Sequence, residues 1–165
     1  MPNLSNRQFF ALVFLSCVGL LASAYYFEYV MFLDPCPLCM MQRIGVLLVG
    51  LVALSGAIFY RKKVSQLIHS GLMLAPSLFG LSVAGRHVWI QSLPPDQVPT
   101  CGPSLEYMVE TLPWSEVLTI MLRGNGNCAD LQWSFLGLSM PQWVAVWFVG
   151  YAVLAGFLLW RSWKK

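Results

Sequence analysis

The chain has 165 residues, of which 58% are hydrophobic and only 10% are charged. Soluble domains carry about 25% charged residues, so this composition excludes both a water-soluble globule and an intrinsically disordered chain. The net charge is only +3 and no dense basic face is available. We therefore expect the lipid bilayer as the main surrounding and no nucleic acid as a partner.

Four apolar segments are long enough to cross a bilayer, which takes about 20 residues for roughly 30 Å of hydrocarbon. Because a lipid-embedded backbone must satisfy its own hydrogen bonds, each segment is predicted to be a helix. The predicted spans are residues 9–27, 40–60, 67–90 and 142–160. The sequence therefore predicts an all-α membrane protein in which residues 1–165 form one domain, a four-transmembrane-helix bundle.

The charged residues predict the orientation of these spans. Basic residues cluster at three places: Arg7, Arg61, Lys62, Lys63, Arg161, Lys164 and Lys165. Four spans put all three places on one side, which the positive-inside tendency makes cytoplasmic. Both termini are then cytoplasmic, and the acidic residues lie at or beyond the other side. That outer side receives a short loop, 28–39, and a long loop, 91–141.

The first span has a second interpretation. Arg7, an apolar run and the small residues 22–24 resemble a cleavable signal peptide. Cleavage would leave three spans in the same orientation. We favour four spans because the apolar stretch continues through Phe27 and because four helices form a better packed bundle.

The positions of the five cysteines indicate the chemistry. Cys17 lies inside the first span, where the expected role is that of a small buried hydrophobic side chain. Cys36 and Cys39 lie in the short outer loop, and Cys101 and Cys128 lie in the long one. Because the extracytoplasmic side is oxidising, two cysteine pairs there predict disulfides, either structural or redox-active.

Residues 36–39 form a Cys-x-x-Cys motif, which alone fits zinc, haem or redox chemistry. Zinc favours a second close pair, whereas Cys101 and Cys128 are 27 positions apart. Covalent haem needs a histidine where the chain has Met40. A disulfide within four residues closes almost no loop and adds little stability. We therefore expect no metal at the motif and favour a redox role over a structural one.

The surroundings of Cys39 favour a reactive thiolate. Cys39 opens the second span, so the positive end of the helix dipole stabilises a negative sulfur. Arg43 follows four residues later on the same helical face. An arginine near the top of a span either reaches lipid phosphates or has a specific partner. In the second case it stabilises the thiolate and donates to a carbonyl of a membrane-borne oxidant.

The long loop is suited to presenting its two cysteines. Four prolines in residues 94–103 keep the chain around Cys101 extended, so that this cysteine can enter the groove of another protein. Apolar residues at helical spacing in 113–123 predict a short helix in the membrane interface, or alternatively a cap packed on the bundle. Glycines and asparagines in 124–127 predict a mobile approach for Cys128.

Taken together, these features resemble the disulfide bond formation protein B (DsbB) family of the bacterial inner membrane. The resemblance covers nearly the whole chain. It rests on the spans, on the motif 36–39 with Arg43 behind it, on the cysteine pair of the long loop, and on the run 128–143 entering the fourth span. The resemblance implies an enzyme, a quinone-dependent protein-disulfide oxidoreductase that reoxidises a periplasmic DsbA-like thioredoxin-fold oxidase and sustains disulfide bond formation.

The resemblance also implies a role for each outer cysteine. Cys101 would take the attack of the reduced DsbA-like partner, and Cys128 would be its disulfide partner. Cys128 would then pair transiently with Cys36 across the two loops. Cys39 would be left as the thiolate that faces the quinone.

A quinone cofactor, ubiquinone or menaquinone, is implied in the same way. Arg43, His87 and Trp133 match positions of the family's quinone site. Two other classes of protein remain open. One is a vitamin K epoxide reductase-like thiol oxidase, whose Cys-x-x-Cys motif lies late in the bundle. The other is a non-catalytic membrane subunit with two structural disulfides.

Overall fold

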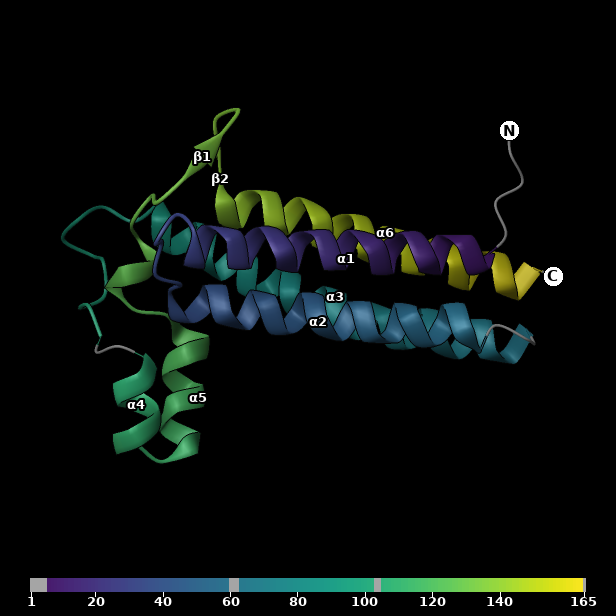
Figure 1. The fold of residues 1–165 in the computed structure, drawn as a ribbon, viewed down its shortest axis with the longest axis horizontal. Helices are drawn as coiled ribbons and strands as arrows, with labels where there is room; N and C mark the ends of the chain where they lie inside the picture. The colour runs from purple at the N-terminus through teal and green to yellow at the C-terminus, as the bar shows by residue number, and fades with distance from the viewer. Residues whose placement is uncertain (1–5, 60–62, 103–104, 165) are drawn as a thin grey trace.

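The computed structural model describes residues 6–59, 63–102 and 105–164. Four long helices lie side by side in a bundle (Figure 1): α1 (Asn6–Tyr29), α2 (Pro37–Ile58), α3 (Lys63–Gln91) and α6 (Met140–Lys164). All four are long and apolar enough to cross a membrane. The predicted all-α, four-span fold class is therefore confirmed. α3 and α6 continue past the predicted apolar windows, because backbone hydrogen bonding and not hydropathy ends a helix.

The long loop between α3 and α6 contains five short elements. They are α4 (Leu105–Thr111), α5 (Trp114–Arg123), the 3-10 turn η1 (Gly126–Cys128), and the strands β1 (Ser134–Phe135) and β2 (Leu138–Ser139). The two strands form an antiparallel hairpin in which Ser134 pairs with Ser139. The sequence analysis did not predict α4, which is too short to show a helical period on its own.

α5 combines the two predicted alternatives, a cap on the bundle and an interfacial helix. Its Val117 is 2% exposed, and Met121 packs against the buried cluster around the cysteines. The side chains of Trp114, Leu118 and Leu122, which follow one another at intervals of four, stay exposed at 74%, 51% and 40%. α5 therefore rests on α2 while presenting an apolar row outward, as an amphipathic helix at a bilayer surface does.

The two ends of the bundle differ in charge and in content. α1 and α3 begin and α2 and α6 end at one end of the bundle, and α4 and α5 lie at the opposite end (Figure 1). The helix termini at the first end carry Arg7, Lys63, Arg161 and Lys164. Arg61, Lys62 and Lys165 lie outside the described residues. The described basic residues at the helix termini are thus separated from the cysteine-bearing end by the length of the bundle.

The middle of the bundle packs around Phe148 of α6, which is fully buried. A Cβ atom at Gly80 of α3 would lie 2.1 Å from the Phe148 ring, so this position leaves room for glycine only. A Cβ atom at Gly45 of α2 would lie 3.0 Å from the same ring and 3.3 Å from the Gly80 Cα. Small residues thus let α2, α3 and α6 approach closely, which stabilises helix association in a membrane.

We expect Gly80→Ala to destabilise the bundle by about 1–3 kcal/mol, because the added methyl group overpacks against Phe148. The measurement is the thermal unfolding midpoint of the detergent-solubilised protein. Gly71→Ala on the same helix is the matched control, since a Cβ there meets no atom within 4 Å. Alanine has the higher helix propensity, so the control should be neutral or slightly stabilising. Equal midpoints for the two variants would contradict this account of the packing.

Candidate active site

The Cys-x-x-Cys motif forms the start of α2. Cys36 is the N-cap residue, and Pro37 follows in the first turn of the helix, where its missing N–H costs nothing. The Cys36 Sγ accepts a hydrogen bond from the Cys39 backbone N–H at 3.3 Å and lies 2.7 Å from the Cys39 Sγ. All five cysteines are free thiols here. Cys39 lies in the first turn, where the N-terminus of α2 favours a thiolate.

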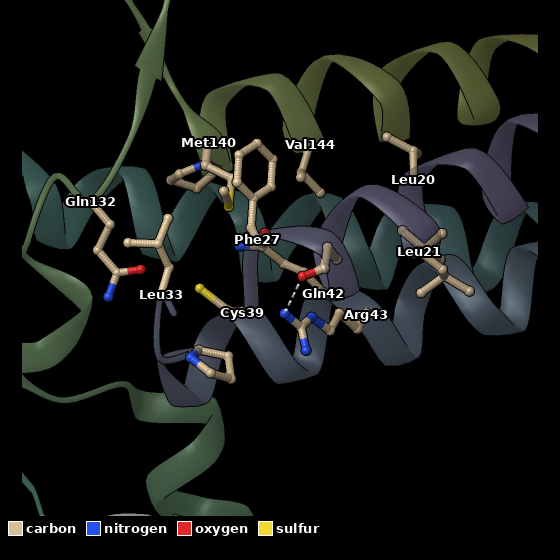
Figure 2. Close-up of a pocket in the computed structure, with 14 residues that line it drawn as sticks. Leu20, Leu21, Phe27, Leu33, Cys39, Gln42, Arg43, Gln132, Met140 and Val144 are labelled. Carbon is tan, nitrogen blue, oxygen red and sulfur yellow. Dashed lines mark hydrogen bonds between the residues drawn. The ribbon is translucent and has the colours of Figure 1, made fainter. Parts of the chain in front are cut away.

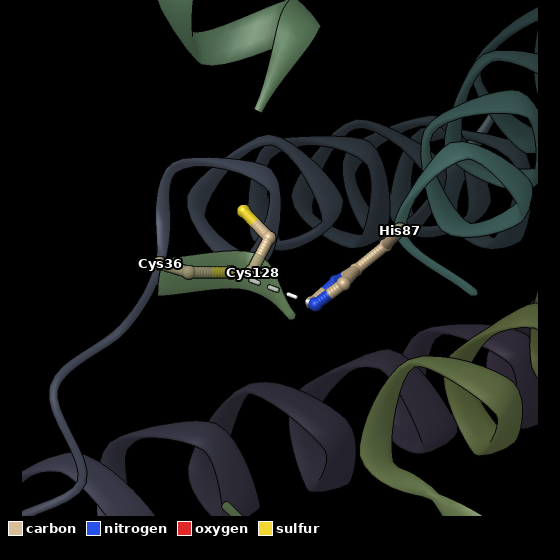
Figure 3. Close-up of side chains that lie close together, drawn as sticks. All are labelled: Cys36, His87 and Cys128. Carbon is tan, nitrogen blue, oxygen red and sulfur yellow. Dashed lines mark hydrogen bonds between the residues drawn. The ribbon is translucent and has the colours of Figure 1, made fainter. Parts of the chain in front are cut away.

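Cys128 reaches the same place from the long loop (Figure 3). It ends η1, is fully buried, and packs in one cluster with Cys36, Leu38 and Ile90. The approach depends on Gly124, whose φ of +74° favours glycine and whose Cβ would lie 2.7 Å from the Leu38 side chain. Apolar packing therefore holds Cys128 beside the motif.

His87 of α3 completes this cluster. Its ring nitrogen and the sulfurs of Cys36 and Cys128 all lie within 4.8 Å of one another, and Nε2 is 3.8 Å from the Cys36 Sγ. Two thiols and an imidazole suit zinc as well as thiol exchange. The separation of cysteines along the chain is therefore no argument against a metal, because the fold brings distant residues together. The residues next to this cluster decide between zinc binding and thiol exchange.

Hydrogen bonding makes Cys36 and Cys128 unequal. The Cys36 thiol donates to Cys128, and this contact, helped by the backbone around Leu38 and Asn125, lowers the pKa of Cys128 to about 6 against the opposing effect of burial. The same contact with Cys128, a second one with Cys39, and burial raise the pKa of Cys36 far above its ordinary value. Cys128 is therefore the thiolate at neutral pH, and Cys36 is its proton-donating neighbour.

Cys101 is exposed and lies against η1. The backbone N–H of Gly126 donates to the Thr100 carbonyl at 3.2 Å. A Cβ atom at Gly126 would lie 2.5 Å from the Pro99 oxygen and 3.0 Å from the Cys101 Sγ, so glycine is required for this approach. Residues 99–102 have no regular secondary structure, whereas residues 95–97 form a turn in the stretch that was predicted to be extended. The segment that carries the exposed Cys101 is thus held against η1, the element that carries the buried Cys128.

A mainly apolar pocket adjoins Cys39 (Figure 2). It is bounded by α1, by the start of α2 and by the start of α6. Its apolar lining residues include Leu20, Phe27, Leu33, Val46, Met140 and Val144. Cys39, Gln42, Arg43 and Gln132 supply its polar groups. Cys39 therefore borders this pocket and also contacts Cys36 in the cysteine cluster.

Arg43 is anchored to α1 at the edge of this pocket. It forms an ion pair with Glu28, and its Nη2 donates to the Ala24 carbonyl at 3.1 Å. The guanidinium carbon also lies 5.4 Å from the centre of the Tyr25 ring. The pairing of Glu28 with Arg43 was not predicted. The signal was present, because an acid at the end of an apolar span is costly unless it has a partner.

His87 and Trp133 are placed differently from Arg43. His87 borders a small cavity beside Cys36 and does not line the pocket at Arg43. Trp133 borders the same small cavity, and its ring centre lies 5.1 Å from that of Phe27, which lines the pocket. His87 is thus grouped with the cysteines, and Trp133 lies between the two cavities. Their contact with a quinone stays a prediction.

Two buried amides near the cysteines were not predicted. Gln42 is 4% exposed, and its Nε2 lies 3.1 Å from the His87 Nδ1. Asn125 is 5% exposed, and its Oδ1 lies 3.9 Å from the Cys128 Sγ. For Gln42 a signal existed, since an amide inside an apolar span requires a hydrogen-bond partner. For Asn125, in a glycine-rich loop, the sequence contains no such signal.

Comparison with known proteins agrees with this geometry. Residues 6–158 match the family model of disulfide bond formation protein DsbB. The chain is 49% identical over 161 residues to disulfide bond formation protein B of Marinobacter nauticus, covering 98% of this chain and 96% of that protein. It is 49% identical over 154 residues to the protein of the same name from Hahella chejuensis, covering 93% of each.

A further relative is disulfide bond formation protein B 1 of Pseudomonas aeruginosa, 44% identical over 151 residues, which are 92% of this chain and 93% of that protein. Each match extends over almost the full length of both chains. Together with the four membrane-length helices, these matches show that the chain belongs to the DsbB family and is a multi-pass membrane oxidoreductase of disulfide bond formation.

Proposed function

We propose that this protein is a quinone-dependent, disulfide-generating enzyme that reoxidises a periplasmic DsbA-like thioredoxin-fold oxidase. The observation that carries the proposal is the position of Cys39, which contacts Cys36 on one side and borders the Arg43 pocket on the other. The exposed Cys101 lies against η1, Cys128 of η1 lies beside Cys36, and Cys36 contacts Cys39 at an apolar pocket between membrane helices.

The relay consists of two thiol–disulfide exchanges. The thiolate of the reduced partner attacks Cys101 of a Cys101–Cys128 disulfide, and the Cys128 sulfur leaves with the electron pair. Cys128 then attacks Cys36 of a Cys36–Cys39 disulfide, and the Cys39 sulfur leaves as a thiolate. Each exchange breaks one S–S bond and forms another, so an electron pair arrives at Cys39. The second cysteine of the partner then attacks the mixed disulfide, which releases Cys101 as a thiolate and leaves the partner oxidised.

The properties of Cys128 and Cys39 support this sequence of steps. While Cys36 is held in its disulfide with Cys39, the backbone around Leu38 and Asn125 still favours the Cys128 thiolate, which makes Cys128 a good leaving group in the first exchange and the nucleophile of the second. Cys128 and Cys36 already lie in one buried cluster, so the second exchange needs no large movement. The N-terminus of α2 stabilises the departing Cys39 thiolate. Because Cys128 contacts a cysteine of the other loop, two independent structural disulfides are a poorer explanation.

The residues of the pocket fit the head of a quinone, with apolar walls for the ring and with donors for its oxygens. Arg43 and Gln42 would hold the carbonyl oxygens, and Phe27 and Val144 would contact the ring. When bound, ubiquinone or menaquinone supplies a two-electron acceptor. An acceptor of this class is required because DsbA is itself a strong oxidant, which couples of the glutathione type cannot reoxidise.

We propose the bacterial inner membrane as the location of this protein. The cysteines would face the periplasm, where the partner is found, and both termini would face the cytoplasm. The basic residues described at the opposite end of the bundle support this orientation, because positively charged ends remain on the cytoplasmic side. The bilayer also gives a diffusing quinone access to the pocket.

The direct test is turnover of the purified protein with reduced DsbA and a soluble ubiquinone analogue. We expect quinone reduction, followed by absorbance, and we expect Cys101→Ser to abolish it because the partner then has no disulfide to attack. The Cys36–Cys39 pair of this variant should still be reduced by a small dithiol, which shows that the rest of the site is intact. Full oxidation of DsbA by the Cys101→Ser protein would contradict the proposed entry point.

For Arg43, we expect the Michaelis constant for the quinone to rise in Arg43→Lys and to rise further in Arg43→Ala. Lysine keeps the charge but lacks the planar fork that holds two acceptors at once. The measurement is steady-state quinone reduction, compared with stopped-flow formation of the Cys101 mixed disulfide, which should change little. Arg86→Lys is the matched control, because Arg86 lies at the same end of the bundle but donates to the Arg123 carbonyl. An unchanged constant in Arg43→Ala would limit this residue to joining α2 to α1 through Glu28 and Ala24.

The lowered pKa of Cys128 predicts the pH dependence of its alkylation in the reduced protein. The thiolate persists down to its pKa and is lost below, so the rate should be half-maximal near pH 6. In Cys36→Ala the strongest donor is removed, and the midpoint should move toward the ordinary thiol value of about 8.5. Alkylation is followed at Cys128 by peptide mass spectrometry between pH 5 and 9, with Cys17→Ala as the control. A midpoint that stays near pH 6 in Cys36→Ala would contradict the assigned cause.

A further inference from the structure

Gln42 of α2 and His87 of α3 form a buried polar pair next to the cysteine cluster. They are 4% and 3% exposed. The Gln42 Nε2 lies 3.1 Å from the His87 Nδ1. Leaving either group unpaired at this depth would be costly, so each is the partner that the other requires. Gln42 also borders the quinone pocket, but the relay described above assigns no task to its contact with His87.

The direction of their hydrogen bond fixes the position of the proton on His87. An amide nitrogen is a donor, so the His87 Nδ1 accepts and carries no proton. The single proton of the ring is then on Nε2, which lies 3.8 Å from the Cys36 Sγ (Figure 3). His87 therefore presents an N–H group where Cys36 and Cys128 meet.

Cys36 is the sulfur of this site that most needs a donor. Its side chain is 5% exposed, and burial disfavours the charged thiolate as which it must depart, so Cys36 is a slow leaving group without a donor. Arg43 is held by Glu28 and the Ala24 carbonyl of α1. Apart from the Cys39 backbone N–H, the His87 ring is the nitrogen donor that the described structure places beside this sulfur.

We propose that His87 is a catalytic residue for the release of Cys36 and that Gln42 is the positioning residue that keeps the proton on the His87 Nε2. This inference rests on the relay proposed above. In the returning step the Cys101 thiolate attacks Cys128 of the Cys36–Cys128 disulfide. The Cys101–Cys128 bond forms, the Cys36–Cys128 bond breaks, and Cys36 leaves with the electron pair. The His87 N–H donates a hydrogen bond to the departing sulfur, and no proton needs to be transferred.

The first experiment isolates Cys36 as a leaving group, with neither partner protein nor quinone present. The full-length Cys39→Ser/Cys101→Ser protein is oxidised to its Cys36–Cys128 disulfide and treated with reduced glutathione. Attack on Cys128 releases Cys36, whereas attack on Cys36 releases Cys128. Acid quenching, alkylation and peptide mass spectrometry give the initial rates of the two adducts, and their ratio measures how readily Cys36 leaves.

The ratio is the rate of the Cys128 adduct, which reports release of Cys36, divided by the rate of the Cys36 adduct. In His87→Phe we expect this ratio to fall about tenfold, which corresponds to the loss of one hydrogen bond to a charged group. His69→Gln, which changes the other histidine of α3, is the matched control and should leave the ratio unchanged. If His87 only held α3 against η1, His87→Phe would change the rates of the two adducts by the same factor and would leave their ratio unchanged. An unchanged ratio in His87→Phe therefore overturns the inference.

The second experiment reads the proton on His87 directly. Nitrogen-15 NMR of the histidine-labelled protein, with the His69→Gln variant for assignment, should show the Nε2–H tautomer. In Gln42→Glu the carboxylate can only accept, so the tautomer should change to Nδ1–H. The glutathione ratio should then fall as in His87→Phe, although the ring is still in place. An Nδ1–H tautomer in the unsubstituted protein, or an unchanged ratio after the tautomer has changed, overturns the role of Gln42.

The two proposals fail in different ways. If the Cys36–Cys128 disulfide cannot be formed in the Cys39→Ser/Cys101→Ser protein, the relay itself is wrong and the inference falls with it. If the disulfide forms and is cleaved with an unchanged ratio in the His87 and Gln42 variants, the relay stands and the inference alone is wrong.

Discussion

The contact between η1 and the first turn of α2 determines which sulfurs can react with one another. The positive φ of Gly124 and its lack of a side chain let the loop pack closely against Leu38. The packing of Leu38 and Ile90 then buries Cys128 beside Cys36. The free energy that holds this contact comes from apolar packing and not from a bond between the sulfurs. The contact can therefore persist while disulfides form and break across it, as thiol exchange at a fixed site requires.

A second constraint is that polar groups inside a membrane bundle need partners. Arg43 meets this requirement with Glu28 of α1, and Gln42 meets it with His87 of α3. Each pair joins α2 to a different neighbouring helix. The guanidinium of Arg43 and the amide of Gln42 are thus already oriented at the site. The conformational entropy of these side chains is lost when the protein folds and not in each catalytic cycle.

Features with a local physical signature were predictable from the sequence. The apolar lengths predicted the spans, and the prolines near Cys101 predicted the lack of helix and strand at residues 99–102. Features that depend on packing between distant segments were not. No residue near Cys128 indicates that it lies beside Cys36, and only the family resemblance implied that contact. The pairing of Gln42 with His87 was equally inaccessible, because the sequence shows that a buried amide needs a partner but not which residue supplies it.

The spacing of residues 36–43 separates two faces of one helix. Side chains four positions apart share a face, so Cys39 and Arg43 point to the pocket bounded by α1 and α6. Leu38 and Gln42 are shifted by one position, about 100° around the helix, and they contact η1 and α3. Cys36, at the N-cap, precedes both rows and its sulfur reaches Cys39. A short helical segment can therefore receive an electron pair from one loop and deliver it on another face, without any movement of the helix itself.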